Sequence, residues 1–254
     1  MSAPRLEIDL AKIEHNARTL VERLAGLGIS VTGVTKATLG SPQVARALLR
    51  GGVCGLADSR IENIEGMRHA EVEASMTLVR SPMLSQAARV VAHADVSFNT
   101  ELEVIRKLSA HAEQAGKTHG VVLMVELGDL REGILPGDLE DAVRETLRFP
   151  NITLEGIGAN LACRSGVAPG PENMAELSAL AEATEATFGL ELRIVSGGNS
   201  ANLPWALNSA SVGNEVPNFG MSKLPLTRRS AWTSTSATAK KPRITGTKCS
   251  PANR

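Results

Sequence analysis

Two hydrophobic periods alternate along most of the chain. Short runs of apolar and β-branched residues, typical of buried strands, precede longer segments whose apolar residues recur at helical spacing. The run Ile29–Thr35, for example, leads into a helix that begins near Ser41-Pro42 and stops at Gly51-Gly52. The pattern predicts strands over 6–10, 29–35, 53–57, 76–79, 96–99, 121–127, 152–157 and 193–196, and helices over 11–25, 42–50, 60–69, 85–92, 101–115, 138–148, 172–188 and 202–207.

This regular alternation indicates the fold class. It gives eight strand–helix units with short connections, which favours a parallel sheet. Seven or eight such units favour a closed (β/α)8 TIM-type barrel over an open doubly wound sheet. The open sheet is weakened further because no Gly-x-Gly-x-x-Gly follows the first strand. In a barrel, functional residues gather at the carboxyl ends of the strands, so chemistry is expected there.

Lys36 stands at the carboxyl end of one predicted strand. No acidic residue lies between Leu24 and Ala57 to pair with it. Desolvation at a buried strand end disfavours the charged ammonium form. The neutral amine is a nucleophile that forms Schiff bases with aldehydes such as pyridoxal phosphate. The structural alternative is a lysine that extends along the surface into solvent.

A glycine-rich segment, Ser196-Gly197-Gly198-Asn199-Ser200, closes the last clear strand and opens a helix. Glycines let the backbone approach an anion closely, and Ser200 adds a hydroxyl near the start of the helix. The segment therefore predicts a phosphate-binding loop. An ordinary β-turn with an N-cap serine would have a similar sequence.

Two more strand ends carry candidate groups. Charged residues crowd around two glycines in 126–133, directly after the most apolar strand, and Arg131 among them suits a carboxylate or phenolate oxygen. An internal ion pair is the structural alternative there. Cys163 follows Asn160 near the end of another strand and is a candidate acid/base thiol, or equally a buried structural cysteine.

Composition agrees with a globular protein. Hydrophobic residues make up 43% of the 254 residues and charged residues 21%. No cleavable apolar segment is expected at the start, and no apolar run approaches the length of about 18 residues that a membrane helix needs, so no membrane association is predicted. The three cysteines are far apart and odd in number, which predicts neither a disulfide framework nor a metal site and favours a cytoplasmic location.

Charge is distributed unevenly along the chain. All 27 acidic residues lie in 1–215 together with 19 of the 27 basic ones, so this part carries −8 and the remainder +8. We therefore expect a barrel domain over 1–215 and a basic, Ser/Thr-rich tail over 216–254 that is disordered. Since no basic-aromatic recognition module is present, a specific nucleic-acid partner is not expected.

Several segments together resemble the alanine racemase amino-terminal-domain family, in its ornithine-racemase-like branch. They are Val34–Ala37, Ala57–Asn63, Arg80–Pro82, Met124–Gly133, Asn160–Cys163, Glu172–Met174 and Ser196–Ser200, in order and at sensible spacing. The resemblance covers roughly residues 4–212.

The resemblance implies a pyridoxal 5'-phosphate enzyme that interconverts L- and D-amino acids of the ornithine or alanine type. Lys36 matches the Schiff-base lysine, and Arg131 the arginine near the cofactor's phenolic oxygen and the substrate carboxylate. Asn160 would lie against the pyridine ring, and Asn199 and Ser200 would help to hold the phosphate.

Racemisation needs one acid/base group on each face of the substrate. Lys36 matches the first. Relatives with alanine activity take the second from a tyrosine in a partner subunit's carboxyl-terminal β-domain, and this chain has no tyrosine. Cys163 is the nearest candidate.

The chain departs from the family after residue 211. The family continues with an eighth strand carrying an arginine and a glycine for the cofactor, then with a β-domain. Here Ser211–Gly220 stands in that place, and the arginine is not recognisable. The expected fold is therefore a barrel with an atypical eighth strand and no β-domain, and the family's homodimer would lose its usual partner surface. A frame slip near 211–216 is our hypothesis for this change.

Three functions remain open on this evidence. The first is the racemase. The second is a cofactor-binding protein without turnover, like the single-domain pyridoxal-phosphate homeostasis proteins that share the barrel. The third is an inactive, truncated remnant.

Overall fold

A computed structural model describes residues 7–162 and 166–211, with the backbone alone for 208–211. The strands are β1 (Thr32–Val34), β2 (Gly55–Asp58), β3 (Met76–Leu78), β4 (Val96–Asn99), β5 (His119–Val125), β6 (Ile152–Ala159) and β7 (Ile194–Ser196). The α-helices are α1 (Leu10–Ala25), α2 (Pro42–Arg50), α3 (Ile61–His69), α4 (Ala87–His93), α5 (Leu102–Gln114), α6 (Leu139–Thr146), α7 (Pro171–Phe188) and α8 (Leu203–Ser211). Short 3-10 helices are η1 (Lys36–Thr38), η2 (Leu84–Gln86), η3 (Pro136–Asp138) and η4 (Ser200–Asn202).

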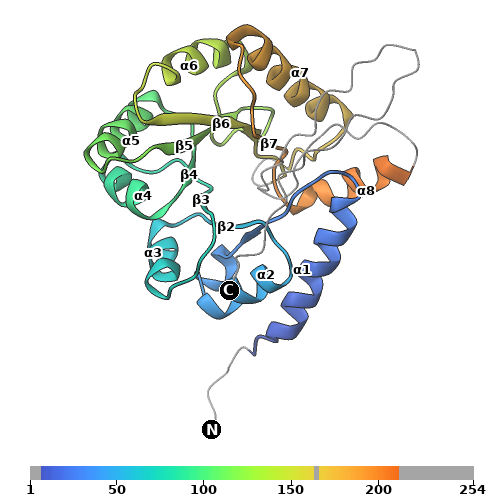
Figure 1. Ribbon diagram of the computed structural model, residues 1–254. Helices are drawn as coiled ribbons and strands as arrows, with labels where there is room; N and C mark the ends of the chain where they lie inside the picture. The colour runs from blue at the N-terminus through green and yellow to red at the C-terminus, as the bar shows by residue number, and fades with distance from the viewer. Residues whose placement is uncertain (1–6, 163–165, 212–254) are drawn as a thin grey trace, which may run out of the picture.

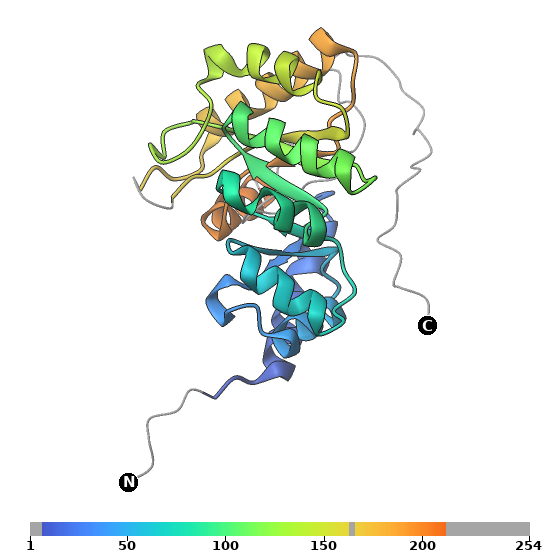
Figure 2. The same ribbon diagram turned by 90° about the vertical axis from the view of Figure 1, so that its left-hand side faces the viewer.

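The strands form a single parallel sheet in the order β1 to β7, so each strand pairs with its neighbours in the sequence. The sheet curls, and the helices lie around its outside (Figure 1). Seen from the side, the helices from the blue N-terminal end to the yellow-green part of the chain follow one another upward in chain order (Figure 2). The predicted parallel barrel-type α/β fold is confirmed, as seven strands of a curled sheet.

Most predicted elements are confirmed, two of them (42–50 and 96–99) at the same residues. The predicted strand over 6–10 is wrong within the described chain, because residues 7–9 form no strand and α1 already begins at Leu10. Asp9 is its N-cap: the carboxylate accepts hydrogen bonds from the backbone N–H groups of Ala11, at 3.0 Å, and Lys12, at 3.1 Å. The predicted eighth-strand region after Ser211 and the tail over 216–254 lie outside the described residues.

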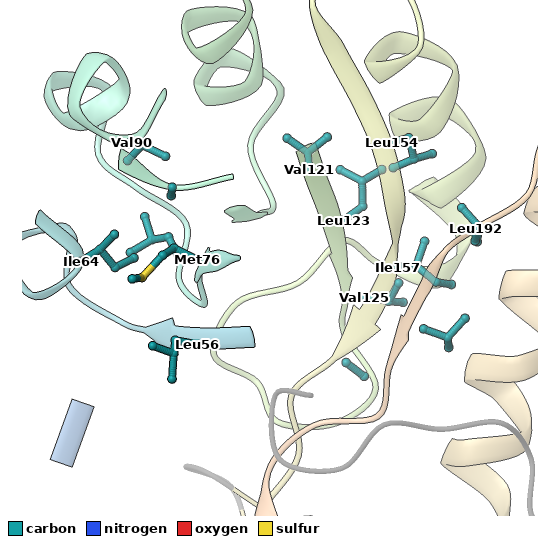
Figure 3. Packing of buried hydrophobic residues seen from close by; sticks show 14 of the residues in the cluster. Leu56, Ile64, Met76, Val90, Val121, Leu123, Val125, Leu154, Ile157 and Leu192 are labelled. Carbon is teal, nitrogen blue, oxygen red and sulfur yellow. The ribbon is translucent and has the colours of Figure 1, made fainter. Parts of the chain in front are cut away.

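Two apolar layers bury the sheet on both faces. The larger layer packs the outer face against the helices, and Figure 3 shows part of it, with Val121 and Leu123 of β5 beside Leu154 and Ile157 of β6. The smaller layer fills the inside of the curl and consists of Ala57, Val79, Phe98, Val122 and Met124. Burial on both faces explains why β5 reads as a continuous apolar run rather than an alternating one. None of the described helices combines the length and apolar character that a membrane span requires.

A bulge in β6 changes its register with β5, close to where β6 pairs with β7. The register with β5 shifts by one residue, so that Val121 faces Leu154 and Val122 faces Gly156. A Cβ at Gly156 would lie 1.7 Å from the carbonyl oxygen of Ile194, so only glycine allows β6 and β7 to pair this closely. The last residue of β7, Ser196, is placed by this pairing.

A buried hydrogen-bond cluster joins the ends of β1 and β2. Thr35, directly after β1, donates from its hydroxyl to the carboxylate of Asp58 at 2.8 Å. The same carboxylate accepts from the backbone N–H of Arg60 at 3.0 Å and from Nδ2 of Asn63 at 2.9 Å. Asp58 has no exposed surface. The cluster fixes the turn in which Lys36 follows Thr35.

We expect Asp58→Ala to lower the free energy of unfolding by about 3 kcal/mol, because it leaves buried donors without an acceptor. Urea denaturation measures the loss. Asp141→Ala is the matched control, since that side chain is 91% exposed, and it should change stability by less than about 0.5 kcal/mol. Equal effects of the two substitutions would contradict a structural role for the cluster.

His119, the first residue of β5, is a buried histidine at the opposite end of the sheet. Its Nε2 lies 2.8 Å from the hydroxyl of Ser97 on β4. Burial disfavours the imidazolium and lowers the pKa of His119 to about 4. The unfolded chain therefore binds a proton in the range between this value and about 6.5, where the folded chain does not.

Stability should consequently fall as pH drops through that window. From His119 alone we expect a loss of about 2 kcal/mol between about pH 7 and about pH 5. Urea denaturation at both values checks this. His119→Asn should remove that part of the pH dependence, and His15→Asn, at an exposed position on α1, should not. An unchanged pH dependence in His119→Asn would show that other groups cause it.

Candidate functional site

Lys36 leaves the sheet at the carboxyl end of β1 and opens the short helix η1. Its side chain lines a pocket of about 340 Å³, together with Asn199 and Ser200 from the segment after β7. The structure thus brings the predicted amine and two residues of the predicted phosphate-binding loop to one cavity. They are about 160 positions apart in the sequence but adjacent here, because parallel strands end at the same edge of the sheet.

Apolar side chains form most of the remaining wall of this pocket. They come from α1 and α2, from β1 and the residues beside it, and from the first residue of α8, Leu203. In Figure 1, α8 lies next to α1, on the side of the sheet where β1 and β7 are not paired with each other. The pocket therefore opens at the seam between the first and last described strands.

The expected desolvation of Lys36 is wrong for the described structure, in which the residue is exposed. β1 pairs with β2 on one side, and among residues 7–162 and 166–211 no strand pairs with its other edge. The prediction rested on the β-branched run Ile29–Thr35, which is typical of a buried strand. Lys36 nonetheless follows a buried, hydrogen-bonded residue, so its backbone is held in place although its side chain reaches solvent.

The glycine-rich segment is shaped by hydrogen bonds of Asn199. Its Oδ1 accepts from the backbone N–H of Ala201 at 2.8 Å, and its Nδ2 donates to the carbonyl oxygen of Leu161 at 2.5 Å. Asn199 is thus the N-cap of η4, and the cap role does not fall to Ser200. Gly198 has a φ of +102°, a backbone conformation that residues other than glycine rarely adopt.

Two polar side chains point into the curl beside this segment. Ile194 belongs with the inner apolar layer and Val195 with the outer one, so Ser196 faces inward by strand alternation. Gly158 pairs with Ser196, and the same alternation turns Asn160 inward. Both residues are almost fully buried.

Within the described part of the chain, Ser196 Oγ and Asn160 Oδ1 have no hydrogen-bond partner. Buried polar atoms are nearly always paired in folded proteins, and leaving one unpaired costs about 1–3 kcal/mol. Two such oxygens on neighbouring strands, beside the glycine-rich segment, fit a ligand that carries both hydrogen-bond donors and acceptors. The Ser196 hydroxyl can donate to a phosphate oxygen, whereas Asn160 Oδ1 can only accept from a donor group of the ligand.

The loop over 126–133 is held by its own acidic side chains. Glu126 Oε1 accepts from the backbone N–H groups of Gly128, at 2.6 Å, and Leu130, at 3.1 Å. Arg131 forms an ion pair with Glu132 at 2.6 Å, so the internal pair weighed as the structural alternative is present.

Asp129 connects that loop to β6. It is 2% exposed, and its Oδ2 lies 3.5 Å from Nδ2 of Asn160. Arg131 and Asn160 do not line the Lys36 pocket described above. Of the predicted site residues, Lys36, Asn199 and Ser200 therefore share a pocket, Asn160 and Arg131 do not line it, and Cys163 lies outside the described residues.

Sequence reasoning missed two buried polar residues beside the site, Asp129 and Asn202. Asn202 has no exposed surface, and its Nδ2 donates to the carbonyl oxygen of Gly197 at 2.9 Å. The sequence carried no signal for Asn202, because asparagine is common at the start of a helix, where the predicted helix over 202–207 places it.

Comparison with known proteins agrees with these features. Residues 8–216 match the family model described as "Alanine racemase, N-terminal domain". A lysine racemase of Thermotoga maritima is 34% identical over 224 residues, covering 85% of this chain and 62% of that protein. An ornithine racemase of Acetoanaerobium sticklandii is 37% identical over 202 residues, covering 79% of this chain and 56% of that protein. The chain thus spans less than two thirds of the length of these relatives.

Solved structures share the fold at low sequence identity. The crystal structure of D-threonine aldolase from Filomicrobium marinum matches with a TM-score of 0.72 and 19% identity, covering 87% of this chain and 61% of that one. PipY of Synechococcus elongatus PCC7942, with PLP bound, matches with a TM-score of 0.61 and 18% identity, covering 80% of this chain and 96% of that one. The family match, the two racemases and the shared barrel-type fold lead to one conclusion: the chain belongs to the alanine racemase N-terminal-domain family.

Proposed function

We propose that this chain forms the pyridoxal-phosphate-binding barrel of an amino acid racemase. The observation that carries the proposal is the shared pocket of Lys36, Asn199 and Ser200. An amine and a glycine-rich anion-binding segment at one cavity are what an aldehyde cofactor with a phosphate group requires. The unpaired oxygens of Asn160 and Ser196 and the family membership support the same cofactor.

Each proposed residue has a separate task. Lys36 holds the cofactor through its aldehyde carbon and moves the substrate's α-proton on one face. The Ser196–Ser200 segment, including Gly197, Gly198 and Asn199, holds the phosphate. Asn160 would help to hold the ring, and Arg131 would bind the phenolic oxygen and the substrate carboxylate. When bound, the cofactor supplies an electron sink that makes loss of the α-proton feasible.

The second proton carrier is assigned to Cys163. Inversion requires a group on the face opposite Lys36, and a thiol can serve as acid and base. The reason for this choice is its position in the sequence, two residues after Leu161, whose carbonyl oxygen accepts the hydrogen bond from Asn199.

An amino acid with a basic side chain is the proposed substrate class, with alanine as the smaller alternative. The support is that two similar proteins are a lysine racemase and an ornithine racemase. This assignment concerns the whole protein's activity, and the chain covers 62% and 56% of those relatives. The proposed location is the cytoplasm.

A cofactor-binding protein without turnover is the second candidate. One observation favours it. The match covers 96% of PipY, a protein solved with PLP bound, whereas the chain covers 62% and 56% of the two racemases. Both candidates require Lys36 and the glycine-rich segment. They differ in whether bound amino acids are inverted.

The proposed function predicts a Schiff base on Lys36. Purified protein should develop the visible absorbance band of a protonated pyridoxal-phosphate Schiff base when the cofactor is added, and Lys36→Ala should abolish the band while leaving the fold intact. Lys107→Ala, at an exposed position on α5, is the matched control and should retain it. A band that persists in Lys36→Ala would refute the role of Lys36, and no band in any variant would favour an inactive remnant.

The second prediction concerns inversion. In deuterium oxide, the cofactor-loaded protein should convert L-ornithine or L-lysine to the D-form, with deuterium entering at Cα, and chiral chromatography with mass spectrometry would detect both. Cys163→Ala should slow inversion by about 100-fold or more, yet one enantiomer should still exchange its α-proton through Lys36. Cofactor binding without exchange or inversion would establish the second candidate instead.

A further inference from the structure

We propose that Asn202 is a positioning residue for the phosphate-binding segment, acting through the carbonyl group of Gly197. This inference rests on the proposed function, because it concerns how the same site holds the cofactor's phosphate. Asn202 is the last residue of η4 and has no exposed surface. It does not line the pocket that contains Lys36, so it acts from behind the segment.

The side-chain amide of Asn202 is fixed by two acceptors. Nδ2 donates to the carbonyl oxygen of Gly197 at 2.9 Å and lies 3.4 Å from Sδ of Met174, which is fully buried on α7. The flipped amide would place Oδ1 against that carbonyl oxygen, two acceptors facing each other. The hydrogen-bond pattern therefore sets the orientation of the side chain, with Nδ2 toward Gly197.

Fixing the carbonyl of Gly197 also fixes the next N–H group. The described peptide bonds are all trans, and in a trans peptide the C=O and the following N–H point in opposite directions. With the Gly197 carbonyl turned toward Asn202 and α7, the N–H of Gly198 is turned away from them. That direction offers it to an anion held in front of the segment, where Ser200 lines the pocket.

The segment would otherwise be free to reorient at this point. Gly198 has a φ of +102°, and glycine allows the neighbouring peptide plane to rotate at little steric cost. The backbone N–H of Asn202 also donates to the carbonyl oxygen of Asn199 at 3.0 Å. Asn202 thus holds the glycine pair from one side while Asn199 anchors it to Leu161 from the other.

Asparagine at this buried position makes the fold less stable than an apolar residue of similar size would. Its Oδ1 is buried and has no hydrogen-bond partner within the described residues. An apolar residue of similar size would fill the same space without an unpaired oxygen. The cost is explained if the amide's purpose is to keep the Gly198 N–H in the anion-binding direction.

The test compares two aldehydes that differ only in the phosphate. Pyridoxal phosphate and pyridoxal are titrated separately into the full chain and into Asn202→Leu, with Schiff-base absorbance as the signal. We expect Asn202→Leu to weaken pyridoxal phosphate binding about 10-fold or more, while pyridoxal binding changes less than about 2-fold. Inorganic phosphate should compete with pyridoxal phosphate in the wild type and lose that ability in the variant.

The control is Thr184→Val, because Thr184 is a buried side chain on α7 that hydrogen-bonds its own helix backbone at 2.8 Å. It should lower thermal stability without changing the ratio of the two affinities. If Asn202→Leu fails to fold, Asn202→Ala, which removes the donor and adds neither bulk nor charge, supplies the same ratio.

Two outcomes contradict the inference differently. Equal weakening of both aldehydes, or no change in either, would leave Asn202 a packing residue and leave the proposed function standing. Failure of the wild type to bind either aldehyde would overturn the proposed function, and the inference with it.

Discussion

Parallel pairing of consecutive strands is the constraint on which the site depends. Because β1 to β7 all run in one direction, their carboxyl ends share one rim, and residues from the ends of β1, β6 and β7 meet there. The alternation of side chains then divides each strand's residues between the helix layer and the inside of the curl. At the ends of β6 and β7 this division turns Asn160 and Ser196 inward, where their oxygens have no hydrogen-bond partner among the described residues.

The residues proposed for chemistry are held by neighbours that are buried and hydrogen-bonded. Thr35, bonded to Asp58, fixes the backbone from which Lys36 extends. Asn199 ties the glycine-rich segment to the end of β6, and Asn202 binds it from the helix side. A flexible amine and a mobile glycine pair would otherwise lose binding energy to conformational entropy, so these anchors pre-organise both ends of the site.

Local pattern predicted the elements well, because short strands buried on both faces and amphipathic helices give distinct periods. It failed at 6–10, where the capping role of Asp9 starts a helix before a strand can form. It also predicted a desolvated Lys36, since periodicity cannot tell what covers the open edge of β1. Asp129 and Asn202 escaped notice because their partners, Asn160 and Gly197, are set by tertiary contacts. For Arg131 the sequence left two interpretations open, an internal ion pair and a ligand contact, and the structure contains the ion pair with Glu132.

One measurement tests the central claim directly. The protein is loaded with pyridoxal phosphate, the Schiff base is reduced with borohydride, and the tryptic peptides are analysed by mass spectrometry for a lysine that carries the reduced cofactor. The account predicts the modification on Lys36, which shares its pocket with Asn199 and Ser200. Modification at a different lysine, or spread evenly over exposed lysines, would contradict it.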